Sequence, residues 1–248
     1  MRLAGNCVLI TGGASGIGLA LAGHFHRAGS EVILCGRRKE ALAHAAQVLP
    51  GVRVRPCDLT REGERKALAT WLEHEAPGLN VLINNAGIQC RIKLAETAHP
   101  AAWAALHEEI AINLEAPVDL TLRLLPLLRR NQRVAIVNVT SGLAFVPLAA
   151  APIYSASKAA LHSFTLSLRH QLGAVGVEVV EILPPAVDTD LGGPGLHTFG
   201  MKLEEFAAEA ARRLDAGEIE IAVGFAAQAA QATPAERAAT FARLNAGH

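Results

Sequence analysis

Short apolar runs alternate along the chain with longer stretches in which apolar residues recur at helical spacing. The short runs are apolar at nearly every position, which indicates strands buried on both faces of a parallel sheet. We predict strands at Cys7–Thr11, Val32–Cys35, Val52–Pro56, Val81–Asn84, Val134–Thr140, Val177–Leu183 and Ile219–Val223. We predict helices near 17–28, 38–48, 61–75, 101–130, 153–173 and 203–215, and a last helix after Pro234.

The order of these elements predicts an α/β architecture. Repeated alternation of strand and helix implies right-handed crossovers, which place the strands in one doubly wound sheet. The seven predicted strands then form a parallel sheet flanked by helices. No low-complexity linker or repeat of fixed period divides the chain. We therefore expect residues 1–248 to form a single domain.

The composition agrees with such a domain and limits its partners. The chain has 248 residues, of which 51% are hydrophobic, enough for a sizeable core. Its formal net charge is zero, so no broad basic surface for nucleic acid is expected. No segment reaches the length of a transmembrane helix, and the apolar N-terminal run contains glycines in place of signal-peptide features. We expect a cytoplasmic protein that binds neither nucleic acid nor membrane.

The four cysteines lack the spacing of a metal site or a redox pair. They are Cys7, Cys35, Cys57 and Cys90, and three of them lie in or beside apolar runs. We interpret them as small buried residues in a reducing compartment, with a functional role for one of them as the alternative. No metal site is predicted.

The first strand is followed by a glycine-rich turn, LITGGASGIG, which opens the first helix. Gly12, Gly13, Gly16 and Gly18 lie where strand becomes helix. Glycines there let backbone N–H groups approach a pyrophosphate, and the helix N-terminus favours an anion. The spacing is TGxxxGxG, not the GxGxxG of the dinucleotide fingerprint. A plain structural turn is the alternative, but the position within a βαβ unit favours a nucleotide site.

Tyr154 is the only tyrosine in the chain, and Lys158 follows four residues later. On a helix the two side chains share a face, and a lysine ammonium beside a phenol lowers the pKa of the phenol. A tyrosine with a pKa moved toward neutrality can act as a general acid or base. An ordinary surface pair is the alternative interpretation.

Two further polar residues favour the catalytic interpretation. Ser141 ends the strand in RVAIVNVTSG, where the carboxyl ends of parallel strands border the ligand crevice. Its hydroxyl could bind a substrate carbonyl beside Tyr154, or it could be a turn residue before Gly142. Asn113 lies in a helical pattern, where it either satisfies local backbone groups or holds a water that connects Lys158 to solvent.

The second strand, in VILCGRR, ends at two arginines. In a dinucleotide fold this end reaches the adenine ribose, where an acidic residue binds the 2′-hydroxyl of NAD and arginine accommodates the 2′-phosphate of NADP. Gly36 stands at the acidic position, and Arg37 and Arg38 follow it. A phosphate would also offset the unfavourable placement of cations at a helix start. We expect NADP(H) as the preferred cofactor and NAD(H) as a second one; arginines that only face water are the alternative.

Together and in order, these motifs resemble the short-chain dehydrogenase/reductase family over essentially the whole chain, and the surrounding text is similar to its bacterial DltE-type oxidoreductases. The motifs are TGGASGIG (Thr11–Gly18), CDL (Cys57–Leu59), NNAG (Asn84–Gly87), Asn113, Ser141, YSASK (Tyr154–Lys158) and PPAVDT (Pro184–Thr189). The resemblance implies a Rossmann fold. The sequence departs from the family at Pro185, where the family has glycine. Proline at this position removes a backbone donor and stiffens the chain where it leaves the strand.

The resemblance also implies roles for single residues. The expected catalytic residues are Tyr154 as acid/base, Lys158 as the group that lowers its pKa and binds the nicotinamide ribose, Ser141 as the substrate-orienting serine, and Asn113 in the proton relay. The expected cofactor-binding residues are Gly12, Ser15, Gly16, Ile17, Gly18, Arg37, Arg38, Asp58, Leu59, Asn84, Ala86, Gly87, Tyr154, Lys158, Val187 and Thr189. Asp58 is expected beside the adenine, and Thr189 at the nicotinamide carboxamide.

These residues predict an oxidoreductase that transfers a hydride between NADP(H) and a small-molecule carbonyl or secondary alcohol. The alternative is a non-catalytic NADP(H)-binding sensor, which should lack one of the catalytic residues. Mainly apolar residues at 143–146, together with Ile88 and Gln89, are expected to line the pocket, so a substrate with hydrophobic bulk is expected. A homodimer or homotetramer is expected through the helices near 101–130 and 153–173.

A substrate lid is expected within residues 190–216, because the glycines of LGGPGLHTFG allow hinge motion. His197 in this segment would either contact the substrate or be an ordinary loop histidine.

Overall fold

The computed structural model describes residues 1–97 and 102–247. Within these residues, seven strands form one parallel sheet in the order β3-β2-β1-β4-β5-β6-β7. The strands are β1 (Cys7–Thr11), β2 (Glu31–Gly36), β3 (Arg53–Pro56), β4 (Val81–Asn84), β5 (Ala135–Val139), β6 (Glu178–Leu183) and β7 (Glu220–Ala222). The predicted doubly wound, seven-stranded parallel sheet is confirmed, with strand ends that agree or differ by one residue.

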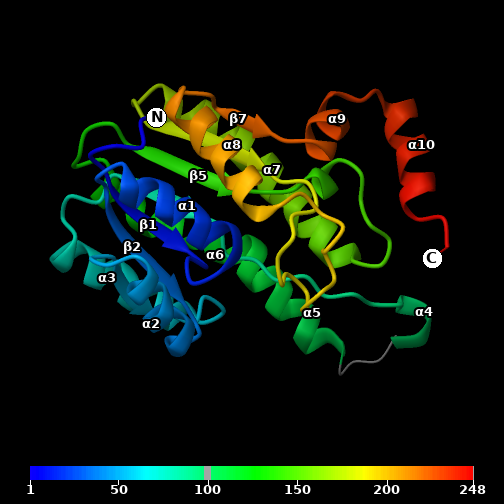
Figure 1. The fold of residues 1–248 in the computed structure, drawn as a ribbon, viewed down its shortest axis with the longest axis horizontal. Coiled ribbons are helices and arrows are strands. Elements are labelled where there is room, and N and C mark those ends of the chain that lie inside the picture. The colour runs from blue at the N-terminus through cyan, green and yellow to red at the C-terminus, as the bar shows by residue number, and fades with distance from the viewer. Residues whose placement is uncertain (98–101, 248) are drawn as a thin grey trace.

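Helices cover both faces of the sheet (Figure 1). They are α1 (Gly16–Arg27), α2 (Lys39–Val48), α3 (Glu62–Glu75), α4 (Leu94–Thr97), α5 (Ala102–Ile110), α6 (Ala116–Leu128), α7 (Pro152–Gly173), α8 (Leu203–Asp215), α9 (Phe225–Gln231) and α10 (Pro234–Leu244). Two short segments have other helical geometries: η1 (Ala111–Glu115) is a π-helical turn, and η2 (Gly142–Ala144) is a 3₁₀ turn.

The central strands are buried on both faces, as their continuous apolar character predicts. In β1, Val8 and Ile10 join the core formed with α1, α2 and α8. Leu9 joins the second core, formed with α3, α6 and α7. Phe25 of α1 and Phe206 of α8 are fully buried on the first face, where these two helices pack together. Helix α8 is therefore part of the layer that covers the sheet.

The predicted helix near 101–130 is interrupted. Its first residue lies outside the described part of the chain, and the rest consists of α5, the π turn η1 and α6. A π turn inserts one extra residue into the helix and is frequent at functional sites. Asn113 lies inside it. The apolar periodicity continues through the turn, so the sequence pattern did not reveal the break.

The C-terminal helix α10 lies apart from the sheet and buries none of its residues (Figure 1). The helix begins at Pro234, as predicted. Thr233 precedes it and forms a capping box with Glu236. Just beyond its other end, Asn245 accepts a hydrogen bond from Ala149 N (2.7 Å) and donates one to Pro147 O (3.1 Å). The chain end is thus attached to the loop that precedes α7.

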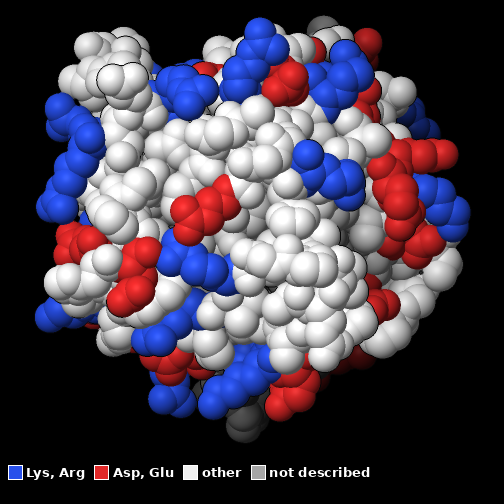
Figure 2. All heavy atoms as spheres, turned by 60° about the vertical axis from the view of Figure 1, so that its left-hand side comes forward, with Lys and Arg blue, Asp and Glu red and all other residues white. Residues whose placement is uncertain are grey.

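Charged side chains of both signs are interspersed on the face shown in Figure 2. This distribution matches the zero formal net charge of the chain. Among the described residues, no helix is both long enough and apolar enough to cross a membrane.

Candidate active site

The carboxyl ends of the central strands border one large cavity of about 1190 Å³. Fifteen of the predicted site residues line it: Gly12, Ser15, Gly16, Ile17, Arg37, Arg38, Asp58, Leu59, Ala86, Gly87, Ser141, Tyr154, Lys158, Val187 and Thr189. Three predicted residues, Gly18, Asn84 and Asn113, are not in its lining, and they support the wall from behind.

The glycine turn after β1 packs directly against the segment after β4. Gly12 has φ +63°, and a methyl group there would lie 2.8 Å from Ala86 Cα. A side chain at Gly18 has no room either, because an added methyl group would lie 2.5 Å from Asn85 Nδ2. The Thr11 hydroxyl accepts hydrogen bonds from the backbone N–H groups of Asn85 and Ala86, both at 3.0 Å. Glycine is thus required here for close packing as well as for turning.

The N-terminus of α1 faces the cavity and forms a cradle suited to an anion. The first turn of α1 carries no acidic residue, and the Ser15 side chain does not cap the helix. Ser15, Gly16 and Ile17 line the cavity at this point. Backbone N–H groups at such a helix start lack intrahelical partners, and the helix dipole favours a negative group. These residues fit the diphosphate of a dinucleotide cofactor.

The two arginines at the end of β2 both line the cavity. Arg37 forms an ion pair with Glu108 of α5, with Nη1 and Oε1 2.7 Å apart. Arg38 Nη2 donates to the Ser15 hydroxyl over 3.2 Å. The unfavourable placement of cations at a helix start is thus already partly offset within the protein, because Glu108 balances the charge of Arg37. A phosphate as a further partner of the two arginines stays a prediction.

Asp58 and Leu59 follow β3 and lie on the same side of the cavity as Arg37. Burial opposes ionisation of Asp58, but hydrogen bonds from Thr60 and the charges of Arg37 and Arg61 hold the pKa of its carboxyl below the usual value. The Asp58 Oδ1 accepts from the Thr60 hydroxyl at 2.7 Å and from its N–H at 3.1 Å. The carboxylate is thus fixed in one orientation at the cavity wall.

Ser141, Tyr154 and Lys158 converge at the carboxyl end of β5. Ser141 follows this strand, and its Oγ accepts a hydrogen bond from Leu143 N at 3.1 Å. The Ser141 side chain lies close enough to the Tyr154 phenol to lower its pKa. Lys158 lies one turn after Tyr154 on α7, with its Nζ 5.7 Å from the phenol ring centroid. All three side chains are more than nine-tenths buried and line the cavity.

The protein's own groups do not produce the expected lowering of the Tyr154 pKa. Burial is the main cause that raises the pKa of Tyr154 to about 12. The nearby Ser141 side chain lowers this pKa, and the charge of Glu109 raises it. Burial also lowers the pKa of Lys158 to about 8. The Lys158 ammonium donates to Val139 O at 2.8 Å, so it is directed at the backbone of β5. In this arrangement the phenol is held in its protonated form.

Asn113 binds the loop after β4 rather than facing the cavity. Its Oδ1 accepts from Ile88 N, and its Nδ2 donates to Ile88 O, both at 2.9 Å, with a third hydrogen bond to Ser157 Oγ at 3.1 Å. A methyl group at Gly87 would lie 3.3 Å from Asn113 Oδ1 and 3.5 Å from Lys158 Nζ. The fully bonded amide places the loop beside Lys158, and its predicted part in a proton relay stays a prediction.

Asn84 is a structural residue at the end of β4. Its side chain is buried and donates to Asn138 Oδ1 of β5 at 2.9 Å. This bond links the two central strands immediately before the cavity. Asn84 is expected to bind the cofactor, but it is not in the cavity lining, so a cofactor contact of its side chain stays a prediction.

A buried polar network beneath Ser141 was missed by the sequence reasoning. Thr140, which precedes Ser141, donates to Glu181 Oε1 at 2.6 Å, and His162 Nδ1 lies 2.9 Å from both oxygens of the same carboxylate. The hydrogen bond to Glu181 raises the pKa of His162 against the effect of burial. No spacing rule joins residues from β5, β6 and α7, so only the structure could reveal the network.

Residues 188–201 form a loop over the cavity whose two ends are joined. Val187 pairs with Met201, Asp188 N donates to Met201 O at 2.9 Å, and Lys202 forms an ion pair with Asp188 at 3.0 Å. Leu191, Gly192, His197 and Phe199 of this loop line the cavity. Helix α8 follows and packs on the sheet, so the proposal of a lid concerns the loop rather than the whole of 190–216.

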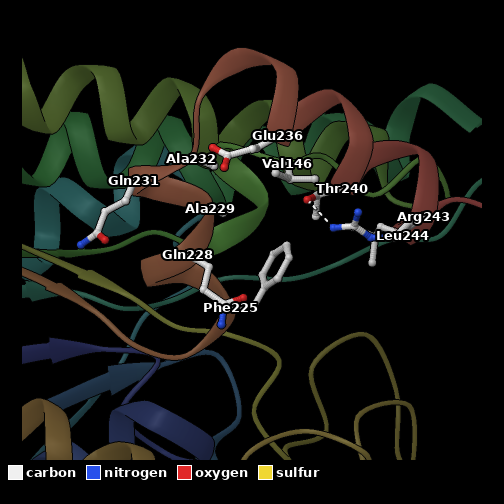
Figure 3. A pocket seen from close by; sticks show the side chains of 10 residues that line it. All are labelled: Val146, Phe225, Gln228, Ala229, Gln231, Ala232, Glu236, Thr240, Arg243 and Leu244. Atoms are coloured by element: carbon white, nitrogen blue, oxygen red, sulfur yellow. Dashed lines mark hydrogen bonds between the residues drawn. The ribbon is translucent and has the colours of Figure 1, made fainter.

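The cavity continues toward the C-terminal helices. A second hollow of about 680 Å³ lies between η2, α9 and α10, and it shares Phe225 and Leu244 with the main cavity. Figure 3 shows the Phe225 ring directed into this hollow. One end of the main cavity is thus bounded by Phe225 and Leu244 of the C-terminal helices, which the sequence reasoning did not include.

Comparison with known proteins agrees with the fold and the site. A family model described as short chain dehydrogenase matches residues 6–196. The uncharacterized oxidoreductase DltE of Bacillus subtilis (strain 168) is 46% identical over 226 residues, covering 89% of each chain. Among solved structures, a short chain dehydrogenase from Burkholderia cenocepacia in complex with NADP has a TM-score of 0.83 at 30% identity, covering 98% of this chain and 99% of that one.

A short-chain dehydrogenase from Sphingobium yanoikuyae in complex with NADPH has a TM-score of 0.78 at 30% identity, covering 87% of each chain. The matched motifs, the parallel sheet and the cavity at its carboxyl edge lead to the same conclusion. The chain belongs to the short-chain dehydrogenase family of oxidoreductases.

Proposed function

We propose that the protein is an NADP(H)-dependent oxidoreductase that transfers a hydride between the cofactor and a carbonyl or secondary alcohol. The observation that carries the proposal is the convergence of Ser141, Tyr154 and Lys158 on one wall of a cavity whose other wall suits a dinucleotide. A sensor that had lost catalysis would not need this buried set.

The cofactor, when bound, supplies the hydride. The α1 N-terminus with Ser15, Gly16 and Ile17 would hold its diphosphate, and Asp58 and Leu59 would border the adenine. The residues expected around its ribose and nicotinamide are Ala86, Gly87, Tyr154, Lys158, Val187 and Thr189.

In the reducing direction, Ser141 and Tyr154 donate hydrogen bonds to the carbonyl oxygen. The raised pKa keeps the Tyr154 phenol protonated, so its O–H can give a proton as negative charge develops on that oxygen. Lys158, with a pKa lowered to about 8, can exchange a proton near neutral pH and so can resupply the phenol. Burial of all three groups excludes bulk water from this transfer.

The preference for NADP(H) is supported by the end of β2. Gly36 offers no carboxylate to a ribose hydroxyl, and Arg37 and Arg38 line the cavity beside it. A guanidinium group binds phosphate through paired, charge-assisted hydrogen bonds. Two of the related solved structures, at 30% identity, are complexes with NADP or NADPH.

The substitution Tyr154→Phe tests the reaction directly. We expect kcat for ketone reduction to fall by at least about 100-fold, since a positioned general acid contributes that much, while NADPH still binds. Absorbance loss of NADPH with a panel of ketones measures turnover, and NADPH fluorescence measures binding.

Ketone turnover by Tyr154→Phe near the wild-type rate would contradict the assignment of Tyr154. A wild-type protein that binds NADPH but reduces nothing in a broad panel would favour the sensor.

A further inference from the structure

We propose that Gln89 and His197 form a polar subsite at the substrate end of the cavity, which binds a hydroxyl group of the substrate. The proposal rests on the function proposed above and names a substrate class for it: ketones that carry a neutral hydroxyl group, in place of wholly apolar ketones.

Both side chains are more than nine-tenths buried and both line the cavity. Gln89 is 6% exposed, and its Oε1 is buried without a hydrogen-bond partner among the described residues. His197 is 9% exposed, and its Nδ1 is buried and unpartnered in the same part of the chain. A buried acceptor without a donor costs about 1–3 kcal/mol, so two of them beside one cavity point to a ligand that supplies donors.

The two side chains belong to different loops, and each lies close to the dipeptide Leu191–Gly192. A methyl group at Gly192 would lie 3.4 Å from Gln89 Oε1 and 3.1 Å from Gln89 O. The backbone of the adjacent residue, Leu191, lies close enough to the His197 ring to raise its pKa against the effect of burial. The loop after β4 and the loop 188–201 thus hold Gln89 and His197 on two sides of the same short segment.

The chemistry of the subsite favours a neutral donor over an anion. Burial lowers the pKa of His197, and the charge of Arg91 lowers it further. The ring is therefore neutral near pH 7. With the proton on Nε2, the unpartnered Nδ1 is an acceptor. A carboxylate would place its lone pairs against the two acceptors, whereas a hydroxyl donates to one of them and can still accept from Arg91 at the rim, which also lines the cavity.

Matched ketone pairs test the proposal, because an ethyl group replaces a hydroxymethyl group with little change of shape. The probes are para-(hydroxymethyl)acetophenone against para-ethylacetophenone for a remote hydroxyl, and hydroxyacetone against butanone for a neighbouring one. Para-acetylbenzoate tests an anion. We expect kcat/KM of at least one hydroxylated ketone to exceed that of its isostere by about ten-fold or more, since the isostere leaves buried acceptors unpaired.

Removing the acceptors should reverse this preference. In the double variant Gln89→Met with His197→Phe, the hydroxylated ketone should lose about ten-fold in kcat/KM while the apolar isostere gains, because no acceptor is left unpaired. His197→Gln keeps an acceptor and should retain part of the preference. Gln228→Met is the matched control, since Gln228 is exposed and lines only the second hollow of Figure 3. If Gln89 and His197 only stabilised the fold, the double variant would lower kcat/KM for the hydroxylated ketone and for its apolar isostere together.

The same comparison made by calorimetry on Tyr154→Phe with NADPH separates this proposal from the proposed function. Tighter binding of the hydroxylated ketones there supports the subsite even if the wild type reduces nothing. The subsite is overturned if both ketones of each pair react and bind equally, or if para-acetylbenzoate is preferred. Ketone reduction in either case still supports the proposed reductase function.

Discussion

Arg37 and Arg38 have a different interpretation in the sequence than in the structure. In sequence they are adjacent cations that call for an anion. In the structure Arg37 already contacts Glu108, and Arg38 contacts Ser15 at the diphosphate cradle. Both still line the cavity, so their cofactor role depends on whether a phosphate can compete with these partners.

We predict that Arg37→Ala and Arg38→Ala each lower the ratio of kcat/KM for NADPH to that for NADH by about ten-fold or more, since a charge-assisted hydrogen bond contributes about 1.5–3 kcal/mol. Glu108→Gln should have the opposite effect, a lower KM for NADPH alone, because it frees Arg37. Steady-state kinetics with both cofactors measures the ratio.

Arg130→Ala is the control for these variants, because Arg130 is exposed and lies outside the cavity lining. Equal efficiency with both cofactors in the wild type, or an unchanged ratio in Arg37→Ala and Arg38→Ala, would refute the NADP preference.

At the scale of elements, β5 leads into the wall of the cavity that we propose to be catalytic, and its neighbours support it from behind. Thr140 precedes Ser141 and binds Glu181 of β6, which in turn pairs with His162 of α7. Lys158 of α7 binds Val139 O of β5. Helix α7 thus supplies the Tyr154 phenol as well as the contacts of Lys158 with β5 and of His162 with β6.

We predict that His162→Gln destabilises the protein in a pH-dependent way. The pKa of His162 is raised in the folded state, so its pairing stabilises fully below the unfolded pKa and is lost as pH rises through the folded pKa. The loss should be about 2 kcal/mol near pH 5.5, the scale of a hydrogen bond to a charged group, and smaller near pH 9. Urea unfolding at the two pH values gives the difference.

His170→Gln is a suitable control for the previous substitution, because His170 is exposed on the same helix. An effect of His162→Gln that is equal at both pH values, or larger at high pH, would show that the charged pair is not what stabilises the strand.

The elements also show where sequence patterns reach their limit. Long periodic segments and buried strands were predicted well, because burial on one or both faces imposes a period. Helices α4 and α9, with 4 and 7 residues, are too short for a period to be recognised. The π turn at Asn113 leaves the apolar pattern intact, so the element most specific to the site was invisible.

At the scale of the whole molecule, several large apolar side chains stay exposed on the helices expected to mediate assembly. Leu122 of α6 is 64% exposed and Leu166 of α7 is 44% exposed. An apolar interface between copies of the chain would bury side chains of this kind. They support the proposal of a homodimer or homotetramer, which the single chain leaves open.

We predict that Leu122→Glu together with Leu166→Glu lowers the oligomeric state, because a charged side chain in an apolar interface is desolvated without a partner. Light scattering after gel filtration measures the mass of the wild type and of the variant. Phe241→Glu, on the exposed face of α10, serves as the comparison. A monomeric wild type would end the proposal, and a drop in mass for Phe241→Glu alone would move the interface to α10.

The sequence by itself determined the parallel sheet, the glycine turn, and the positions of Ser141, Tyr154 and Lys158, since these depend on local periodicity and on motifs a few residues long. Tertiary structure alone decided the partners of Arg37, the bonds of Asn113, the network under Ser141 and the placement of Gln89 and His197 in the lining of one cavity. Each of these joins residues from separate elements, and burial there sets the protonation of Tyr154 and Lys158 in a direction that spacing could not predict.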